Sequence, residues 1–508
     1  MKRAAIGAAT LGVASLLAAC AALPPPVTTP RAPLSSTELG LAGPAFAPAP
    51  GAWWHAFGDP QLDALMSDAL RDNPRLAEAH ARWQAALAQA AAARAAQLPG
   101  ARVRASEERL KIPSGFGPNL LGGQTVWYGG LSAALSWDPD LWGQHADERA
   151  AAVHQAGAAE MDQSEARLLL SGAVVQAYLQ LDRAAALEQI AADTEAQRAR
   201  VVQITRRRVA AGLDTRVELR EAEGAVPQAH LALLQAQVEE ALAKHQLAAL
   251  AGRGADLYAT IKTPHLDAHS LQALPAMLPI NLLARRPDVI AARERIVASD
   301  AQRQAARAAF YPSINLSALV GFASVSLSNL ISAESLGYGA GPALTLPIFD
   351  GGRLRAQYRG AQAQLMQAIA DYDDTVLAAV RQAADQLSLI DSLAAQREQQ
   401  ASWVEAAQEA YRLDEERYRA GLANYLSVLS AESDVFNARR TAVELDTQRA
   451  AARVTLLIAL GGSFSAPSPT ATAATIATAA TTATAATTAT AATTAQTAQL
   501  RHSFITEN

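Results

Sequence analysis

The residue whose chemistry is most readily interpreted is Cys20, the only cysteine in the 508-residue chain. It follows Leu17-Ala18-Ala19, a pattern that resembles a bacterial lipobox, in which the cysteine becomes the acylated first residue of the mature protein. Residues 1–19 begin with Lys2 and Arg3 and continue with an apolar run that is typical of a secretory signal and too short to span a membrane. We therefore expect a signal peptide over residues 1–19 and a covalent lipid on Cys20. The alternative is a plain signal peptide with an incidental cysteine.

The other chemically capable residues form no catalytic or metal-binding pattern. The nine histidines are scattered, and no G-x-S-x-G, P-loop or H-E-x-x-H arrangement occurs. The acidic group of Asp371, Asp373 and Asp374 is typical of a solvated helix face. The net charge of -5 gives no basic excess, so we expect no nucleic-acid partner. We expect a protein that is not an enzyme and that carries no cofactor besides the lipid on Cys20.

An internal repeat with an offset of 209 residues organises the chain. The segment 210–213 matches 419–422, and Leu250-Ala251-Gly252 matches Ala459-Leu460-Gly461. Two homologous halves are the economical explanation. The domains that we predict are a lipid-anchored extended strap (20–59), a first repeat (60–252), an inter-repeat linker (253–280), a second repeat (281–464) and a disordered Ala/Thr-rich tail (465–508).

Each repeat predicts the same order of elements. A helix over about 60–98, or 281–311 in the second repeat, precedes two short strands. A very long helix follows over 143 to about 210, or 351 to about 419, and a glycine turn then leads into a return helix. A proline-free helix of this length extends about 100 Å at a rise of 1.5 Å per residue, which no compact domain contains. We therefore expect antiparallel helices, with two shorter helices stacked end to end beside each long one.

Coiled-coil spacing supports close packing of these helices. Apolar residues recur at steps of three and four in both return helices, at Leu219, Ala222, Val226 and Ala229 and again at Val428, Ala431, Val435 and Ala438. Taken alone, this spacing favours an ordinary soluble coiled-coil bundle.

The strands decide between a bundle and a pore. Residues 313–320 and 336–348 alternate between apolar and polar or small side chains over about ten residues, the length that a tilted strand needs to cross a bilayer. In the first repeat, one face is apolar and has a tryptophan at each end: Trp127, Leu131, Leu135 and Trp137. The opposite, lumen-facing side is polar and carries Arg102, Arg104 and Ser106. Four strands cannot close a membrane barrel alone, because unpaired edge groups in lipid cost several kcal/mol each. The membrane interpretation therefore requires oligomerisation, and the alternative is surface hairpins on a soluble protein.

Several short motifs resemble one known family, the TolC-like outer-membrane factors, and specifically their lipoprotein branch of OprM/NodT type. The resemblance covers Trp53 to about Gly462, and its most telling segments are Trp53-Trp54, Phe57-Gly58-Asp59-Pro60, Asn73-Pro74, Leu282-Leu283-Ala284-Arg285-Arg286-Pro287-Asp288, Phe349-Asp350-Gly351-Gly352 and Arg417-Tyr418-Arg419-Ala420-Gly421. It implies a mainly helical fold with transmembrane β-structure: a homotrimer with a twelve-stranded barrel in the outer membrane, four strands per protomer, continuous with a long periplasmic helical barrel.

The resemblance also implies a function and partners. Such channels are the exit ducts of tripartite efflux systems, pass drugs or small solutes, and dock through their helical tips onto a periplasmic adaptor that links them to an inner-membrane transporter. The turns that match the docking tips contain Ala211, Gly212 and Leu213 and, in the second repeat, Ala420, Gly421 and Leu422. A bare turn without a partner is the alternative at these positions, and a pore-less coiled-coil lipoprotein of the periplasm is the alternative for the whole chain.

One departure from the family concerns closure of the periplasmic aperture. The resemblance implies an apolar ring at Leu426, followed four and seven positions later by an acidic and a basic residue, but this chain has Ser430 and Ser433 there. Negative charge is available nearby at Glu432 and Asp434, or from the first repeat at Asp214 or Glu218. We expect the aperture to be formed by Leu426, Ser430, Ser433, Asp434 and Asp214.

Overall fold

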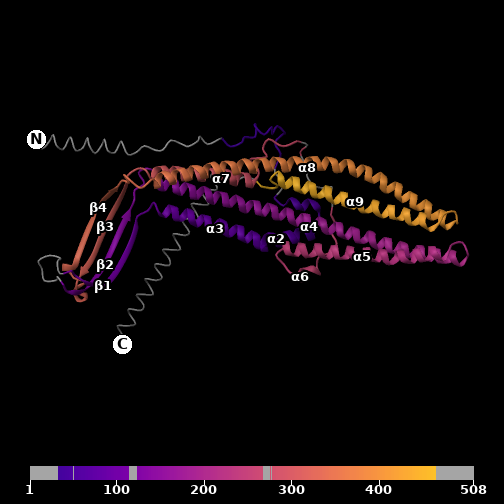
Figure 1. The fold of residues 1–508 in the computed structure, drawn as a ribbon, viewed down its shortest axis with the longest axis horizontal. Coiled ribbons are helices and arrows are strands. Elements are labelled where there is room, and N and C mark those ends of the chain that lie inside the picture. Colours follow the sequence, from indigo (N-terminus) through magenta and orange to yellow (C-terminus); the bar gives the residue numbers. More distant parts are fainter. Residues whose placement is uncertain are drawn as a thin grey trace, which may run out of the picture.

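The computed structural model is an elongated molecule in which a long helical body carries a small sheet at one end (Figure 1). It describes residues 32–47, 49, 51–113, 123–266, 275 and 277–464. The predicted signal peptide, the lipidation site Cys20 and the Ala/Thr-rich tail lie outside the described residues, so they remain predictions from the sequence.

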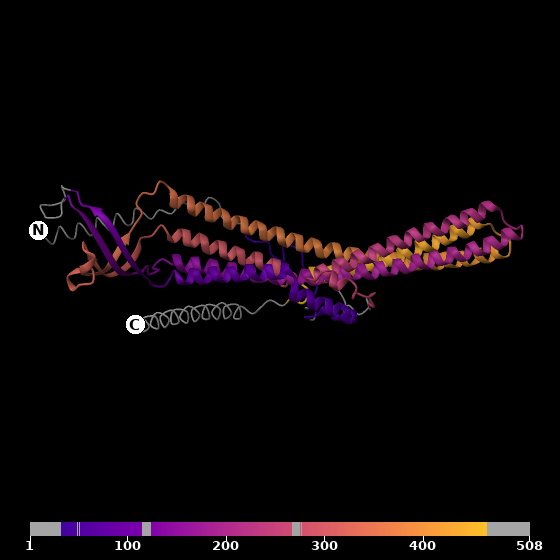
Figure 2. The ribbon, with the colours of Figure 1, turned by 90° about the horizontal axis from the view of Figure 1, so that it is seen from below.

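The helices of the two repeats match each other in length. The long helices α4 (Gln144–Ala210) and α8 (Arg353–Arg419) each contain 67 residues, and the return helices α5 (Arg216–Leu250) and α9 (Tyr425–Ala459) each contain 35. The outer helices α3 (Pro74–Ala95) and α7 (Pro287–Ala308) each contain 22. Helix α4 packs against α3 and α5, and α8 packs against α7 and α9, as the stacked arrangement predicts (Figures 1 and 2).

The first helix of each repeat differs from the prediction. The segment 60–98 forms two helices, α2 (Pro60–Asp72) and α3, which are separated by Asn73 in an extended conformation. A residue before proline is disfavoured in the α region, and the Asn73 side chain instead accepts a hydrogen bond from the Arg75 backbone N–H at 2.9 Å and caps α3. In the second repeat, α7 begins at Pro287 rather than at residue 281, because proline is well suited to the first helical turn.

Glycine turns reverse the chain at the far end of the helical body. Gly212 and Gly421 have φ angles of +73° and +80°, a left-handed conformation that glycine adopts without a steric penalty. The next residue in each turn, Leu213 or Leu422, donates its backbone N–H to a carbonyl of the last helical turn at 2.9 or 2.8 Å. Each long helix can therefore end within one turn, so that its return helix runs back alongside it.

One antiparallel sheet joins the two repeats. Its order is β1 (Gly100–Lys111), β2 (Thr125–Trp137), β3 (Ser313–Ser324) and β4 (Leu336–Thr345). The central pair, β2 and β3, comes from different repeats, so neither half forms its sheet alone. Strand β4 ends at Thr345, before the predicted residue 348, because its partner strand β3 begins at Ser313, the residue that pairs with Thr345. Strands β1 and β4 are the two edges of the sheet, and each has one side without a partner strand among the described residues.

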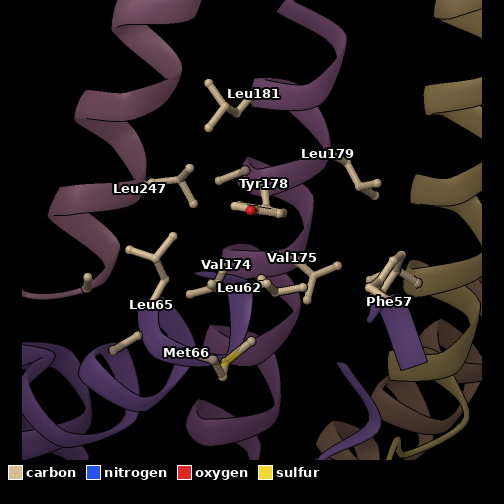
Figure 3. Packing of buried hydrophobic residues seen from close by; sticks show 14 of the residues in the cluster. Phe57, Leu62, Leu65, Met66, Val174, Val175, Tyr178, Leu179, Leu181 and Leu247 are labelled. Carbon is tan, nitrogen blue, oxygen red and sulfur yellow. The ribbon is translucent and has the colours of Figure 1, made fainter. Parts of the chain in front are cut away.

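The largest apolar core lies in the middle of the helical body, where α2 meets α4 and α5. Phe57 of the short helix η1 (Trp53–Phe57) is fully buried there, together with Leu62, Met66 and Leu247 (Figure 3). Burying each of these side chains contributes about 1.5–3 kcal/mol. The Tyr178 hydroxyl donates to Asp59 Oδ2 at 2.6 Å in the same region, so the segment before α2 is fixed to the centre of α4. The linker continues from α5 through the one-turn helix α6 (Ala255–Tyr258).

Candidate functional site

The two glycine turns lie together at the end of the molecule opposite the sheet (Figure 2). All six residues predicted for the docking tip are exposed there, three in each turn. Leu213 and Leu422 are 64% and 73% exposed, so each turn presents a leucine to solvent. The structure thus brings together the two segments that the repeat relates over 209 residues.

Behind the turns, four polar side chains join one hairpin to the other. We call Thr205, Arg208, Asp214 and Tyr418 the Arg208 cluster. The Arg208 guanidinium donates two hydrogen bonds to the Asp214 carboxylate, at 2.8 and 2.9 Å, and a third to the Tyr418 carbonyl at 2.5 Å. It also lies over the Tyr418 ring, 4.4 Å from the ring centroid. Because Arg208 and Asp214 belong to the first hairpin and Tyr418 to the second, this cluster spans the boundary between repeats.

The Tyr418 hydroxyl lies between two groups of the first hairpin. It donates to Asp214 Oδ2 at 2.6 Å and lies 2.8 Å from Thr205 Oγ1. Hydrogen bonds from Arg208 hold the pKa of Asp214 below its ordinary value, and burial raises the pKa of Tyr418 to about 12. At neutral pH the carboxylate is therefore charged and the phenol is protonated, which is the state in which all these hydrogen bonds form.

A second ion pair crosses the same boundary further from the tip. Glu432 of α9 is buried and Arg198 of α4 is half-buried, with Oε2 and Nε 3.2 Å apart, and Arg198 also donates to the Ala225 carbonyl at 3.0 Å. Burial raises the pKa of Glu432, and its other oxygen, Oε1, has no hydrogen-bond partner among the described residues. Glu432 therefore lies between the hairpins rather than on an exposed face of α9.

The predicted aperture residues fall into two groups. Leu426, Ser430 and Asp434 are exposed and follow each other at steps of four along one face of α9, with Leu426 64% exposed. Ser433 is half-buried and donates to the Leu429 carbonyl at 2.9 Å. Asp214 lies apart from this face, in the Arg208 cluster. Glu218 accepts the Thr215 backbone N–H at 2.5 Å and caps α5.

Sequence reasoning missed part of this site. It proposed Asp214 as a source of negative charge but gave no role to Thr205, Arg208 or the Tyr418 side chain. One signal was present: Arg208 and Asp214 carry opposite charges on the two sides of a short glycine turn. No sequence pattern indicated the contact with Tyr418, because it depends on how the second hairpin is rotated against the first.

The sheet has one apolar and one polar face, as the alternation predicts. Arg104 pairs with Ser132, while Leu131 pairs with Phe322 and Val320 with Tyr338, so these two sets lie on opposite faces. The apolar face carries nine large side chains that are each at least 37% exposed: Val103, Trp127, Leu135, Trp137, Leu316, Val320, Leu336, Tyr338 and Leu344. A contiguous exposed apolar face of this kind marks an interaction surface for lipid or protein.

The described residues can also be searched for membrane-spanning helices and for metal sites. Within the described part of the chain, no helix combines the length and apolar character that crossing a membrane requires. The described residues also contain no group of three or more His, Cys, Asp or Glu side chains that could hold a metal ion.

Comparison with known proteins agrees with this geometry. The family model described as outer membrane efflux protein matches residues 65–253 and 278–462. The chain belongs to this family. It is similar to the outer membrane protein OprJ of Pseudomonas aeruginosa, with 32% identity over 466 residues that cover 91% of this chain and 97% of OprJ. The fusaric acid resistance protein FusA of Burkholderia cepacia is 37% identical over 315 residues, which cover 61% of this chain and 59% of FusA.

A solved structure of the same kind extends the comparison to the fold. The outer membrane protein VceC of Vibrio cholerae is 32% identical, with a TM-score of 0.77 over 82% of this chain and all of the VceC chain. The predicted fold class is confirmed: long helices in two repeats, with a small antiparallel sheet to which each repeat gives two strands. The function is that of an outer-membrane efflux channel, and the family consists of channel proteins.

Proposed function

We propose that three copies of this chain close into an exit duct that receives solute from an inner-membrane pump through a periplasmic adaptor and releases it, chemically unchanged, outside the cell. The observation that carries this proposal is the sheet, which combines an apolar face with two unpaired edges. In lipid, each unpaired backbone group costs several kcal/mol, so an edge must find a partner strand. Pairing β1 of one copy with β4 of the next satisfies both edges, and three copies give twelve strands.

The helical body supplies a second surface for assembly. Helix α5 has an apolar stripe of four exposed residues that no other described element covers, formed by Leu231, Leu234, Val238 and Leu242, which are 62%, 45%, 58% and 59% exposed. Their spacing of three and four residues places them on one side of the helix. Packing this stripe against the neighbouring protomer would continue the helical wall around the duct.

The two ends of the molecule have different partners in this proposal. The exposed turns around Gly212 and Gly421 dock onto the adaptor, with Leu213 and Leu422 as apolar contacts. At the other end, the lipid on Cys20 anchors the strap in the outer membrane. The exposed stripe of Leu426, Ser430 and Asp434 lines the periplasmic aperture.

The experiment that tests the duct is disulfide cross-linking between β1 and β4. Within one chain, β2 and β3 separate these strands by about 14 Å, since neighbouring strands are about 4.8 Å apart, whereas a disulfide requires Cα atoms within about 7 Å. A matrix of cysteine pairs, with one cysteine in β1 and one in β4 of each chain, should therefore yield covalent dimers and trimers.

Matched cysteine pairs in β1 and β3, which are never adjacent, serve as the control. The purified protein should also give channel current in planar bilayers. A chain that forms no covalent oligomer from any β1–β4 pair and carries no current would instead be a pore-less periplasmic lipoprotein.

A further inference from the structure

The polar face of the sheet carries two arginines near the helical end of β1. Arg102 and Arg104 are exposed, lie two residues apart on the same face, and follow closely after α3, which ends at Ala95. Their Cα partners on β2 are Ala134 and Ser132, so no bulky side chain lies beside them. This places two guanidinium groups where the helical body passes into the sheet.

Neither guanidinium is neutralised. Among the residues that the structure describes, neither Arg102 nor Arg104 has an ion-pair or hydrogen-bond partner, although most other arginines do. Glu108 is the only acidic residue on this face within the four strands, and it lies four residues beyond Arg104, about 13 Å away at 3.3 Å per residue. Each protomer therefore contributes two uncompensated positive charges at this level of the sheet.

The same face is hollowed around these arginines. A concavity of about 620 Å³ is lined by Arg102 and Arg104, by serine hydroxyl groups and by backbone next to Gly339 and Gly341. The serines are Ser132, Ser136 and Ser317. Apart from Leu319, the side chains on this face of β2, β3 and β4 at the concavity are small and leave room in front of the guanidinium groups. Hydroxyl donors beside planar guanidinium donors suit a carboxylate or a phosphate, which arginine can bind through two parallel hydrogen bonds.

We propose that Arg102 and Arg104 form an anion-binding ring at the junction of the helical duct and the barrel, so that the channel favours anionic solutes. This inference rests on the proposed trimeric duct, in which three copies bring six guanidinium groups around one lumen. A water-filled passage with low-dielectric walls focuses the field of such charges and raises the local concentration of the opposite ion. The cargo class that follows is organic anions bearing a carboxylate or phosphate group.

The test is the reversal potential of single channels in a potassium chloride gradient at low salt, where screening is weak. We expect the wild-type channel to pass chloride more readily than the variant R102S/R104S, whose chloride-to-potassium permeability ratio should fall by about threefold or more. Wild-type current carried by potassium chloride should also be reduced by added benzoate, an aromatic carboxylate, and this reduction should weaken in the variant.

The matched control is R109S, which removes one arginine from the same strand but on the opposite face, where Arg109 lies 5.7 Å from the Trp127 ring centroid. Its permeability ratio should equal that of the wild type. A second variant, S132D, keeps both arginines and places a carboxylate on the Cα partner of Arg104, so the ratio should fall as well. This variant keeps the test decisive if R102S/R104S does not assemble.

The outcomes separate this inference from the proposed function. If the wild type gives no channel current at all, the duct itself is wrong. If it conducts, and neither R102S/R104S nor S132D changes the permeability ratio, the duct stands and the anion-binding ring is refuted.

Discussion

Replacing Tyr418 with phenylalanine should loosen the contact between the two hairpins at the tip. The substitution removes one oxygen atom and leaves the buried ring under Arg208, so the packing at this position is retained. What is lost is the hydrogen bond to Asp214 Oδ2 at 2.6 Å and the contact with Thr205 Oγ1 at 2.8 Å. Both partners belong to the first hairpin, so the loss falls entirely on the interface between repeats.

The size of the effect follows from the groups that remain. Asp214 keeps its two hydrogen bonds from Arg208, and the single Thr205 hydroxyl proton can donate to the Val201 carbonyl at 3.1 Å once the Tyr418 oxygen is removed, so neither is left without a partner. A buried hydrogen bond to a charged group contributes about 1.5–3 kcal/mol and a neutral one about 1 kcal/mol. Part of this is offset by relaxation, and we expect a net loss of about 2 kcal/mol. That loss shifts the equilibrium between joined and separated hairpins about 30-fold.

Two measurements check this prediction. Spin labels at positions 213 and 422, both exposed, should report a broader and longer distance distribution in Tyr418→Phe than in the wild type. Channels in planar bilayers should spend more time in high-conductance states. The control is Tyr425→Phe, which removes the hydroxyl of another buried tyrosine, a hydroxyl that makes no hydrogen bond among the described residues. Equal distance distributions and equal open probability in all three proteins would refute the role that we give to the Arg208 cluster.

Three further predictions concern other parts of the chain. Leu426→Ala should raise single-channel conductance, because Leu426 narrows the aperture, whereas Leu422→Ala should leave the conductance unchanged. A Leu426→Ala channel with the wild-type conductance would contradict the assignment of Leu426 to the aperture. Gly252→Ala should destabilise the protein in thermal unfolding by more than Gly212→Ala, because both glycines have positive φ but only at Gly252 would a Cβ lie 2.6 Å from the Asp72 carbonyl. Burial raises the pKa of Glu165 from 4.5 to about 7, so its destabilising effect is absent at pH 4, grows as the pH rises, and is complete above pH 7. Glu165→Gln should therefore stabilise the protein by about 1 kcal/mol at pH 8, after allowance for solvent screening, and have no effect at pH 4 in chemical denaturation.

Much of the helical architecture could be predicted because its signals are local. The long helices were expected over 143 to about 210 and 351 to about 419, and they occupy Gln144–Ala210 and Arg353–Arg419. Prolines are absent inside them, and a glycine that can adopt positive φ follows each one, so both ends are specified by nearby residues. The first helix was predicted as one element over about 60–98, although Asn73-Pro74 marks the start of a helical stretch, and the structure divides the segment there into α2 and α3.

The strand faces could also be predicted, because a period of two assigns every side chain to a face once the strand is recognised. Arg102, Arg104 and Ser106 lie opposite Trp127 and Leu131, as the alternation requires. Sequence spacing contained no information on the contact of Arg208 with Tyr418, whose positions are 210 residues apart. That contact depends on the rotation of α4 against α8 and α9, which is set by packing of the apolar cluster around Val201 and Val428.

The repeat explains why a contact at the tip can be so specific. With the offset of 209, Arg208 corresponds to Arg417 and Tyr418 corresponds to Val209, but the paired positions do not behave alike. Arg417 is exposed and pairs with Asp414 on its own helix, whereas Arg208 is buried and reaches the other repeat. The two hairpins therefore share their lengths and turns but differ in the polar side chains that they present to each other. Because both repeats belong to one chain, this asymmetric contact forms within every protomer. When the contact breaks, α4 still packs against α5 and α8 still packs against α9. We therefore expect the tip to open by separation of its two hairpins, each of which stays folded.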